Sequence, residues 1–174
     1  MPMHKNKNIV LIGFMGVGKG TIARAFIKEN KKISLDTDDL IESMENRKIK
    51  AIFEEDGENY FRKLEEKIAK WLEKNVKNCV ISTGGGFYKV DNLTKIGTIV
   101  YLKSSFEGIL KRLKEHENAE LKLAKRPLLS DLIKARKLFD EREKAYETKA
   151  DITIDVEDKK IKTIVDELLK TLKN

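Results

Sequence analysis

The feature that most constrains the fold is a glycine-rich loop near the N-terminus, which reads GFMGVGKGT at residues 13–21. An apolar run, Asn8–Ile12, precedes it and predicts a buried strand, and apolar residues recur at helical spacing after it, over 21–29. A strand, a glycine-rich loop with a lysine and a helix, in this order, form the pattern of a P-loop. Its backbone N–H groups surround a phosphate, and Lys19 reaches the outer phosphates of a nucleotide. The loop therefore predicts a phosphate-binding site.

One position departs from the usual P-loop. A Ser or Thr normally follows the lysine directly, and its hydroxyl binds Mg²⁺. Here Gly20 takes that position and Thr21 comes one residue later. The order Gly-Lys-Gly-Thr resembles the P-loop of adenylate kinases, in which the ion is held mostly through water. The protein ligand of the metal is therefore left open.

Strand and helix patterns alternate along the rest of the chain. The further predicted strands are Lys32–Asp36, Cys79–Ser82, Thr98–Leu102 and Ile152–Asp155. One further helix is predicted to start at Asp38. Four others are predicted over Glu58–Asn75, Ser105–Lys114, Leu129–Thr148 and Lys159–Leu172. This alternation predicts an α/β fold with a parallel sheet covered on both faces. A chain of 174 residues corresponds to one domain, 1–174.

Composition excludes several classes of protein. Charged residues make up 37% of the chain, and no apolar run approaches the roughly 18 residues of a membrane span. No secretory segment is visible at the N-terminus. The single cysteine, Cys79, excludes a disulfide scaffold and fits a reducing cytosol. The net charge of +7 suits anionic partners, but most lysines alternate with glutamates, as on a solvated surface.

Two carboxylates follow the second predicted strand. Asp36 and Asp38 stand at i and i+2, so on an extended segment they would project to the same side. At the carboxyl edge of a parallel sheet they would face the ligand crevice. One would act on Mg²⁺ or its waters, and the other would accept the proton of a substrate hydroxyl. Asp38 also qualifies as a helix N-cap.

Two more motifs point to a small polar ligand. Arg62 and Glu65 are i, i+3 neighbours on a predicted helix, and an arginine held by a carboxylate is aimed to bind a substrate carboxylate. An ordinary surface ion pair is the alternative interpretation. Gly84–Gly86 follow an apolar strand and leave the backbone open to a ligand.

Taken together, the ordered motifs resemble those of the shikimate kinase family. They are GFMGVGKGT (13–21), DTD (36–38), FRKLE (61–65), STGGG (82–86), RPLL (126–129) and R-x3-Y-x3-A (142–150). The family transfers the γ-phosphoryl group of ATP to the 3-hydroxyl of shikimate, on the route to chorismate and the aromatic amino acids. The resemblance implies a three-layer α/β/α fold of the P-loop kinase type, similar to nucleoside monophosphate kinases, with a five-stranded parallel sheet in the order 2-3-1-4-5.

The resemblance also implies roles for individual residues. Asp38 would be the catalytic base, assisted by Lys19 and Arg126, and Asp36 would support Mg²⁺ through water. Glu65 would orient Arg62. The implied shikimate-binding residues are Asp38, Arg62, Gly84, Gly85, Gly86 and Arg142. The implied ATP-binding residues are Gly16, Val17, Gly18, Lys19, Gly20, Thr21, Arg112 and Arg126.

Two subregions of the single domain follow from the same resemblance. Residues 37–65 would bind the substrate, and the charged, weakly periodic segment 115–126 would be a mobile lid carrying Arg126. The family has an adenine-stacking arginine shortly before its lid, and Arg112 is the nearest candidate. We expect a cytoplasmic monomer that binds shikimate, ATP and Mg²⁺, and neither nucleic acid nor a membrane.

Two alternatives remain from the sequence. The Gly-Lys-Gly-Thr order favours another small P-loop kinase, acting on gluconate or a nucleoside monophosphate. The paired aspartates, the triple glycine and the arginines favour a polyhydroxy acid as acceptor, which gluconate also is. A pI near 9.3 suggests a nucleic-acid-binding P-loop protein, but the chain has no aromatic platform and no arginine-rich tract.

Overall fold

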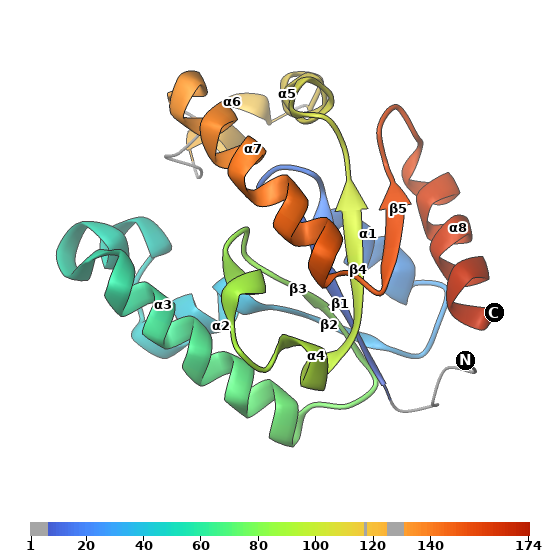
Figure 1. Ribbon diagram of the computed structural model, residues 1–174, viewed down its shortest axis with the longest axis horizontal. Coiled ribbons are helices and arrows are strands. Elements are labelled where there is room, and N and C mark those ends of the chain that lie inside the picture. The colour runs from blue at the N-terminus through green and yellow to red at the C-terminus, as the bar shows by residue number, and fades with distance from the viewer. Residues whose placement is uncertain (1–6, 117, 125–130) are drawn as a thin grey trace.

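The computed structural model describes residues 7–116, 118–124 and 131–174 (Figure 1). Its sheet is parallel throughout and has five strands in the order β2-β3-β1-β4-β5. This confirms the predicted fold class and strand order. The strands are β1 (Asn8–Ile12), β2 (Ile33–Asp36), β3 (Cys79–Ser82), β4 (Gly97–Lys103) and β5 (Ile152–Asp155).

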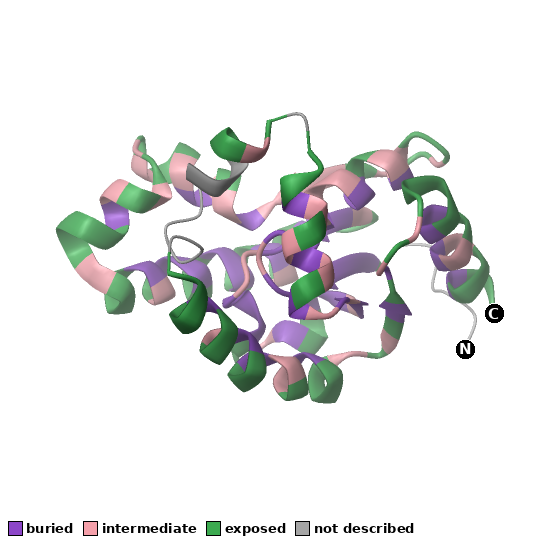
Figure 2. Cartoon of the chain, turned by 90° about the horizontal axis from the view of Figure 1, so that it is seen from above, coloured by how far each residue is buried: buried purple, intermediate pink, exposed green. Residues whose placement is uncertain are grey.

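Helices connect the strands and cover both faces of the sheet. They are α1 (Lys19–Ile27), α2 (Thr37–Glu45), α3 (Ile49–Asn75), α4 (Leu93–Ile96), α5 (Phe106–Lys114), α6 (Ala119–Ala124), α7 (Leu132–Lys149) and α8 (Ile161–Lys173), with a 3₁₀ turn η1 at Phe87–Lys89. Figure 2 shows that the buried residues gather on the sheet and on the inner sides of these helices. The described residues include no helix long and apolar enough to cross a membrane.

The central strand explains why the motifs lie together. Every residue of β1 is buried, because the strand has neighbours on both sides and helices on both faces. β1, β3 and β2 are adjacent and parallel, so their carboxyl ends reach the same edge of the sheet. The P-loop follows the end of β1, the triple glycine lies just beyond the end of β3, and Asp36 is the last residue of β2. Phe14 of the P-loop packs against Phe106 of α5 and Phe139 of α7, with ring centroids 6.3 and 5.2 Å away.

The long helix α3 differs from its prediction. The expected helix began at Glu58, whereas the structure has helical residues from Ile49 with a kink at Gly57 (φ 82°, ψ 174°). The first part was missed because most of its residues are charged or exposed, and only Ile52 is buried. Five apolar residues recur at helical spacing in this helix, and four of them, Phe61, Leu64, Ile68 and Leu72, are buried as that spacing predicts. The fifth, Trp71, is 46% exposed.

The predicted lid segment is partly helical. Ala119–Ala124 forms α6 within 115–126, where a loop was expected. Helix-forming residues are frequent there, and Leu121 is 63% exposed. Residues 117, 125 and 126 lie outside the described part of the chain.

Candidate active site

The P-loop closes around the ammonium group of Lys19. Gly16 and Gly18 have φ values of 86° and 106°, which residues with side chains rarely adopt. These turns bring the loop carbonyls to the lysine, whose Nζ donates to the Gly13 oxygen at 2.6 Å and the Phe14 oxygen at 3.1 Å. Lys19 is buried. The described loop thus has the geometry expected of a phosphate cradle.

Arg112 lies against this loop. A Cβ at Gly18 would be 2.6 Å from its Cζ atom, so the guanidinium rests on the glycine itself. Burial lowers the pKa of Arg112 below its ordinary value. The neighbouring Leu113 packs on Gly16, where a Cβ would be 2.9 Å from its Cδ1 atom. α5 therefore brings the predicted nucleotide arginine to the P-loop.

Asp36 caps α2 and Asp38 lies inside it. Asp36 Oδ1 accepts hydrogen bonds from the backbone N–H groups of Asp38, at 2.9 Å, and Asp39, at 3.1 Å. The alternative role that the sequence allowed for Asp38, as the helix N-cap, is therefore wrong, because Asp36 is the N-cap and the helix begins at Thr37. The two carboxylates also do not share an extended segment, since Asp38 belongs to the first turn of the helix.

The carboxylate of Asp38 is held in an unfavourable environment. Its Oδ1 atom is buried and has no hydrogen-bond partner among the described residues. Burial raises the pKa of Asp38 to about 7, with further contributions from the charges of Asp36 and Glu65 against a lowering by Lys19. A carboxylate that titrates near neutrality can take up a proton during a reaction.

Each glycine of the triple-glycine loop faces a different charged side chain. A Cβ at Gly84 would be 2.6 Å from Asp38 Oδ1, one at Gly85 would be 3.1 Å from Arg142 Nη1, and one at Gly86 would be 2.6 Å from Arg62 Cζ. The absence of three side chains thus lets a carboxylate and two guanidinium groups approach one short stretch of backbone.

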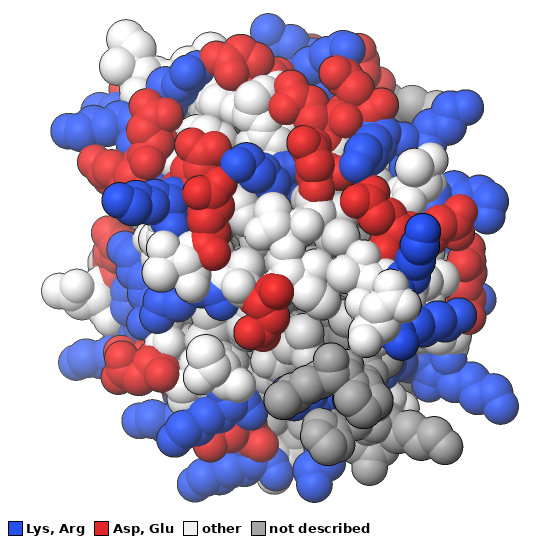
Figure 3. All heavy atoms as spheres, turned by 45° about the vertical axis from the view of Figure 1, so that its right-hand side comes forward, with Lys and Arg blue, Asp and Glu red and all other residues white. Residues whose placement is uncertain are grey.

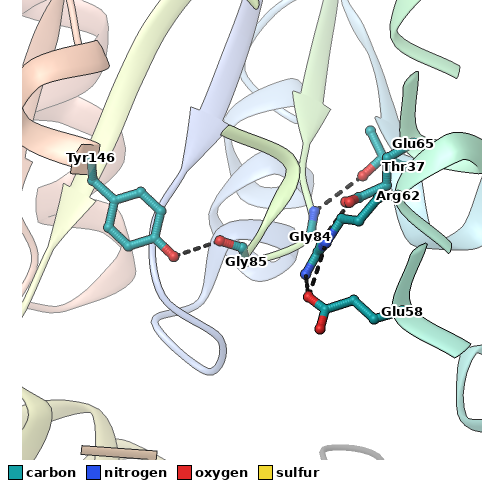
Figure 4. Close-up of polar contacts among 7 residues, drawn as sticks. All are labelled: Thr37, Glu58, Arg62, Glu65, Gly84, Gly85 and Tyr146. Atoms are coloured by element: carbon teal, nitrogen blue, oxygen red, sulfur yellow. Dashed lines mark hydrogen bonds and ion pairs between the residues drawn. The ribbon is translucent and has the colours of Figure 1, made fainter. Parts of the chain in front are cut away.

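The arginines are held differently. Arg62 donates to Glu65 Oε1 and, at 3.1 Å, to Glu58 Oε1 (Figure 4). The Glu65 side chain is only 2% exposed, so this is not an ordinary surface pair. Burial raises the pKa of Glu65 above its ordinary value, although Arg62 opposes the change. Arg142, on α7, is 5% exposed.

Three buried polar side-chain atoms have no hydrogen-bond partner among the described residues: Asp38 Oδ1, Glu65 Oε2 and Arg142 Nε. Natural proteins rarely leave such atoms unpaired, so a group of them requires an explanation. Asp38 and Arg142 face the same glycine loop, and Glu65 holds Arg62 beside it. A ligand that brings a hydroxyl donor and a carboxylate would satisfy Asp38 and Arg142, whose side chains face the same loop.

Two residues of this site lie in the quoted motifs, but the sequence assigned them no role. Thr37 Oγ1 accepts a hydrogen bond from the Gly84 N–H at 3.1 Å, and the Tyr146 hydroxyl donates to the Gly85 carbonyl at 2.6 Å (Figure 4). The i, i+4 spacing of Arg142 and Tyr146 was the only available signal. Arg126, by contrast, was predicted but lies outside the described residues.

The structure offers few direct ligands for a metal. The described residues contain no cluster of three or more His, Cys, Asp or Glu side chains that could hold an ion. Asp36 already uses Oδ1 to cap α2. The residues present therefore fit an ion bound mainly by nucleotide phosphates and water, with a carboxylate nearby.

A P-loop after the first strand of a parallel sheet in the order 2-3-1-4-5, near a glycine loop that a carboxylate and two arginines approach, defines a small P-loop kinase. Residues 15–173 match the family model described as shikimate kinase. The chain belongs to the shikimate kinase family.

Individual relatives agree with this assignment. A shikimate kinase from Helicobacter hepaticus is 46% identical over 140 residues, which cover 80% of this chain and 81% of the relative. The solved shikimate kinase from Acinetobacter baumannii, in complex with shikimate, has a TM-score of 0.84 at 29% identity, covering 95% of this chain and 92% of that one. The enzyme from Aquifex aeolicus has a TM-score of 0.77 at 36% identity, with 95% of each chain covered.

Proposed function

We propose that this chain transfers the γ-phosphoryl group of ATP to the 3-hydroxyl of shikimate, giving shikimate 3-phosphate and ADP. The observation that carries the proposal is the pair of buried side chains, Asp38 and Arg142, that face the triple-glycine loop and each have a polar atom without a partner among the described residues. Shikimate supplies the hydroxyl donor and the carboxylate that these side chains require. A related structure was solved with shikimate bound.

The acceptor lies on the glycine loop. Arg62 and Arg142 bind its carboxylate, which fixes the ring, and the backbone of Gly84–Gly86 lines it. Asp38 accepts a hydrogen bond from the 3-hydroxyl. As the hydroxyl oxygen bonds to the γ-phosphorus, its proton passes to Asp38, and the bond from phosphorus to the β–γ bridging oxygen breaks to release ADP.

The donor lies in the P-loop. The backbone of Gly16–Thr21 surrounds the phosphates, Lys19 neutralises charge on the outer ones, and Arg112 contributes to ATP binding from α5. Arg126 adds a further positive charge from the lid, 115–126. Positioning and charge neutralisation of this kind supply most of the catalysis in phosphoryl transfer.

Magnesium accompanies the nucleotide in this proposal. The ion neutralises phosphate charge when it is bound. Asp36 supports it through water, because Gly20 offers no hydroxyl. The single domain, 1–174, acts as a monomer, and residues 37–65 form its acceptor-binding segment.

The direct test compares acceptors. ATP consumption by the purified chain with Mg²⁺ is measured with shikimate, gluconate or AMP as the only acceptor. We expect stimulation by shikimate and no comparable effect of the other two. Preference for AMP or gluconate would overturn the proposal in favour of another small P-loop kinase.

A further inference from the structure

Buried backbone N–H and C=O groups are nearly always hydrogen-bonded. Each such group of the glycine loop, Gly84–Gly86, should therefore have a partner in the protein or in a ligand. The Gly84 N–H donates to the side-chain oxygen of Thr37 at 3.1 Å. The carbonyl of Gly84 accepts from the N–H of Phe87, also at 3.1 Å. Both polar groups of this first glycine are therefore used inside the protein.

In the next two glycines, only the carbonyl groups have hydrogen-bond partners among the described residues. The Gly86 carbonyl accepts from the N–H of Lys89 at 3.2 Å, and the Gly85 carbonyl accepts from the Tyr146 hydroxyl at 2.6 Å. The N–H groups of Gly85 and Gly86 donate to no described residue. The loop thus retains two donors next to the guanidinium groups of Arg62 and Arg142.

The geometry of the peptide unit couples one of these donors to Tyr146. The described residues contain no cis peptide bond. In a trans peptide, the carbonyl of one residue and the N–H of the next point in opposite directions. The Gly85 carbonyl and the Gly86 N–H belong to the same unit, so a hydroxyl that holds the carbonyl also sets the direction of the N–H.

We propose that Tyr146 is a positioning residue for the substrate carboxylate. Its hydroxyl holds the Gly85 carbonyl and thereby presents the Gly86 N–H to the carboxylate that Arg62 and Arg142 bind. This inference rests on the proposed function, because it assumes that shikimate occupies the pocket.

The surroundings of Tyr146 suit this role. The residue is 1% exposed, stacks on Tyr101 with ring centroids 5.3 Å apart and meets Tyr88 edge-on at 5.0 Å. Burial raises the pKa of Tyr146, although the charge of Arg142 and its hydrogen bond to the Tyr146 hydroxyl oppose the change, so the hydroxyl keeps its proton and remains a donor. Arg142 lies one turn earlier on α7. One helix therefore carries both the charge that binds the carboxylate and the hydroxyl that orients the backbone beside it.

The test removes one oxygen atom. In the full chain, Tyr146→Phe should raise the KM for shikimate about tenfold, which is the size of one lost hydrogen bond. The kcat and the KM for ATP should stay within about twofold, since the phosphate cradle is untouched. Tyr101→Phe is the matched control, because it removes a hydroxyl from the same aromatic cluster without touching the glycine loop, and should leave the KM for shikimate unchanged.

The outcomes separate the two proposals. No turnover of shikimate by the unsubstituted chain would overturn the proposed function and this inference together. Normal turnover, with an unchanged KM for shikimate in Y146F, would overturn the inference alone. Equal increases in the KM for shikimate in Y146F and Y101F would also overturn it, because they would indicate a general loss of packing.

A second measurement decides the question if Y146F does not fold. Amide proton shifts of the unsubstituted protein are followed by NMR during titration with shikimate. The Gly86 proton should move strongly downfield, whereas the Gly84 proton, already bonded to Thr37, should move little. A shift confined to Gly84 would overturn the proposed orientation.

Discussion

At the scale of single residues, Asp38 shows how the site trades stability for chemistry. Its Oδ1 atom is buried against Gly84 and lacks a partner among the described residues, and its pKa is raised to about 7. Burial disfavours the charged form, yet that form is the one that can accept a proton. The burial that destabilises the charged carboxylate thus conflicts with its use as a base. This conflict leads to three predictions.

Replacing Asp38 with Asn should lower kcat about 10²–10⁴-fold, because the amide keeps the shape but cannot take up a proton. ATP binding should change little, since Lys19 and the P-loop remain. Steady-state kinetics and nucleotide titration measure the two effects. A variant that keeps most of its turnover would show that Asp38 only positions the acceptor.

The pH dependence tests the same carboxylate without removing it. Because the base must be ionised, kcat/KM should rise with pH and level off above about 7, the pKa of Asp38. Glu65→Gln should move this midpoint to lower pH, since Glu65 is one of the charges that raise the pKa of Asp38. An unchanged midpoint in E65Q would assign the titration to another group.

Stability should respond in the opposite sense to activity. The pKa of Asp38 is higher in the folded than in the unfolded chain, so the free energy of unfolding falls as pH rises from about 4 to 7. D38N removes this loss and should raise the Tm at pH 8, by about 2–4 °C per kcal/mol recovered. The gain should be smaller at pH 5. A lower Tm of D38N at pH 8 would contradict the assignment of strain to this carboxylate.

At the scale of elements, the kink of α3 depends on one residue. Gly57 has φ 82° and ψ 174°, a conformation that is essentially restricted to glycine. A Cβ at this position would meet no atom within 4 Å, so crowding plays no part. The conformation joins the part of α3 that carries Arg62 to the preceding helical turns.

Gly57→Ala should therefore lower the free energy of unfolding by about 1–3 kcal/mol through backbone strain alone. Gly20→Ala is the control, because Gly20 lies in α1 without a positive φ, and a Cβ would only approach the flexible end of Arg24 at 3.2 Å. Denaturant unfolding of both variants measures the difference. Equal effects would show that the kink tolerates other residues.

Helices and strands could be predicted from the sequence where their apolar residues follow one clear pattern. β1, β3 and β5 were predicted with their observed ends, and the ends of β2 and β4 differ by at most one residue. The helical turns before Gly57 were missed because their sequence has too little apolar periodicity. Packing against the rest of the fold determines their structure. The P-loop was predicted because its residues are contiguous, whereas Tyr146 and Thr37 act on glycines far away in the sequence, which local patterns do not reveal.

At the scale of the whole molecule, the net charge of +7 is accompanied by many ion pairs. The face in Figure 3 shows Lys and Arg interspersed with Asp and Glu. Many of the described charges are paired across elements, as in Lys103–Glu147 between β4 and α7 and Lys111–Asp158 between α5 and the loop before α8. On this face, negative side chains therefore interrupt the positive ones.

This distribution predicts weak binding to nucleic acid. At physiological salt, fluorescence anisotropy with a short duplex should give no saturation below about 10⁻⁴ M, the weak end of non-specific binding. Retained ATP binding in the same buffer is the control for a folded P-loop. Micromolar affinity with a steep salt dependence would instead favour a nucleic-acid partner.

The three unpartnered buried atoms also determine what can inhibit the enzyme. In the proposed binding mode, a competitor that carries only a carboxylate would pair with the arginines but leave the buried Asp38 Oδ1 atom without a donor, and that desolvation cost would remain in its affinity. An inhibitor selective for this site should therefore add a donor at a fixed distance from its acid group. Flat aromatic acids lack this donor, and affinity gained by enlarging their apolar surface would not carry selectivity for this site.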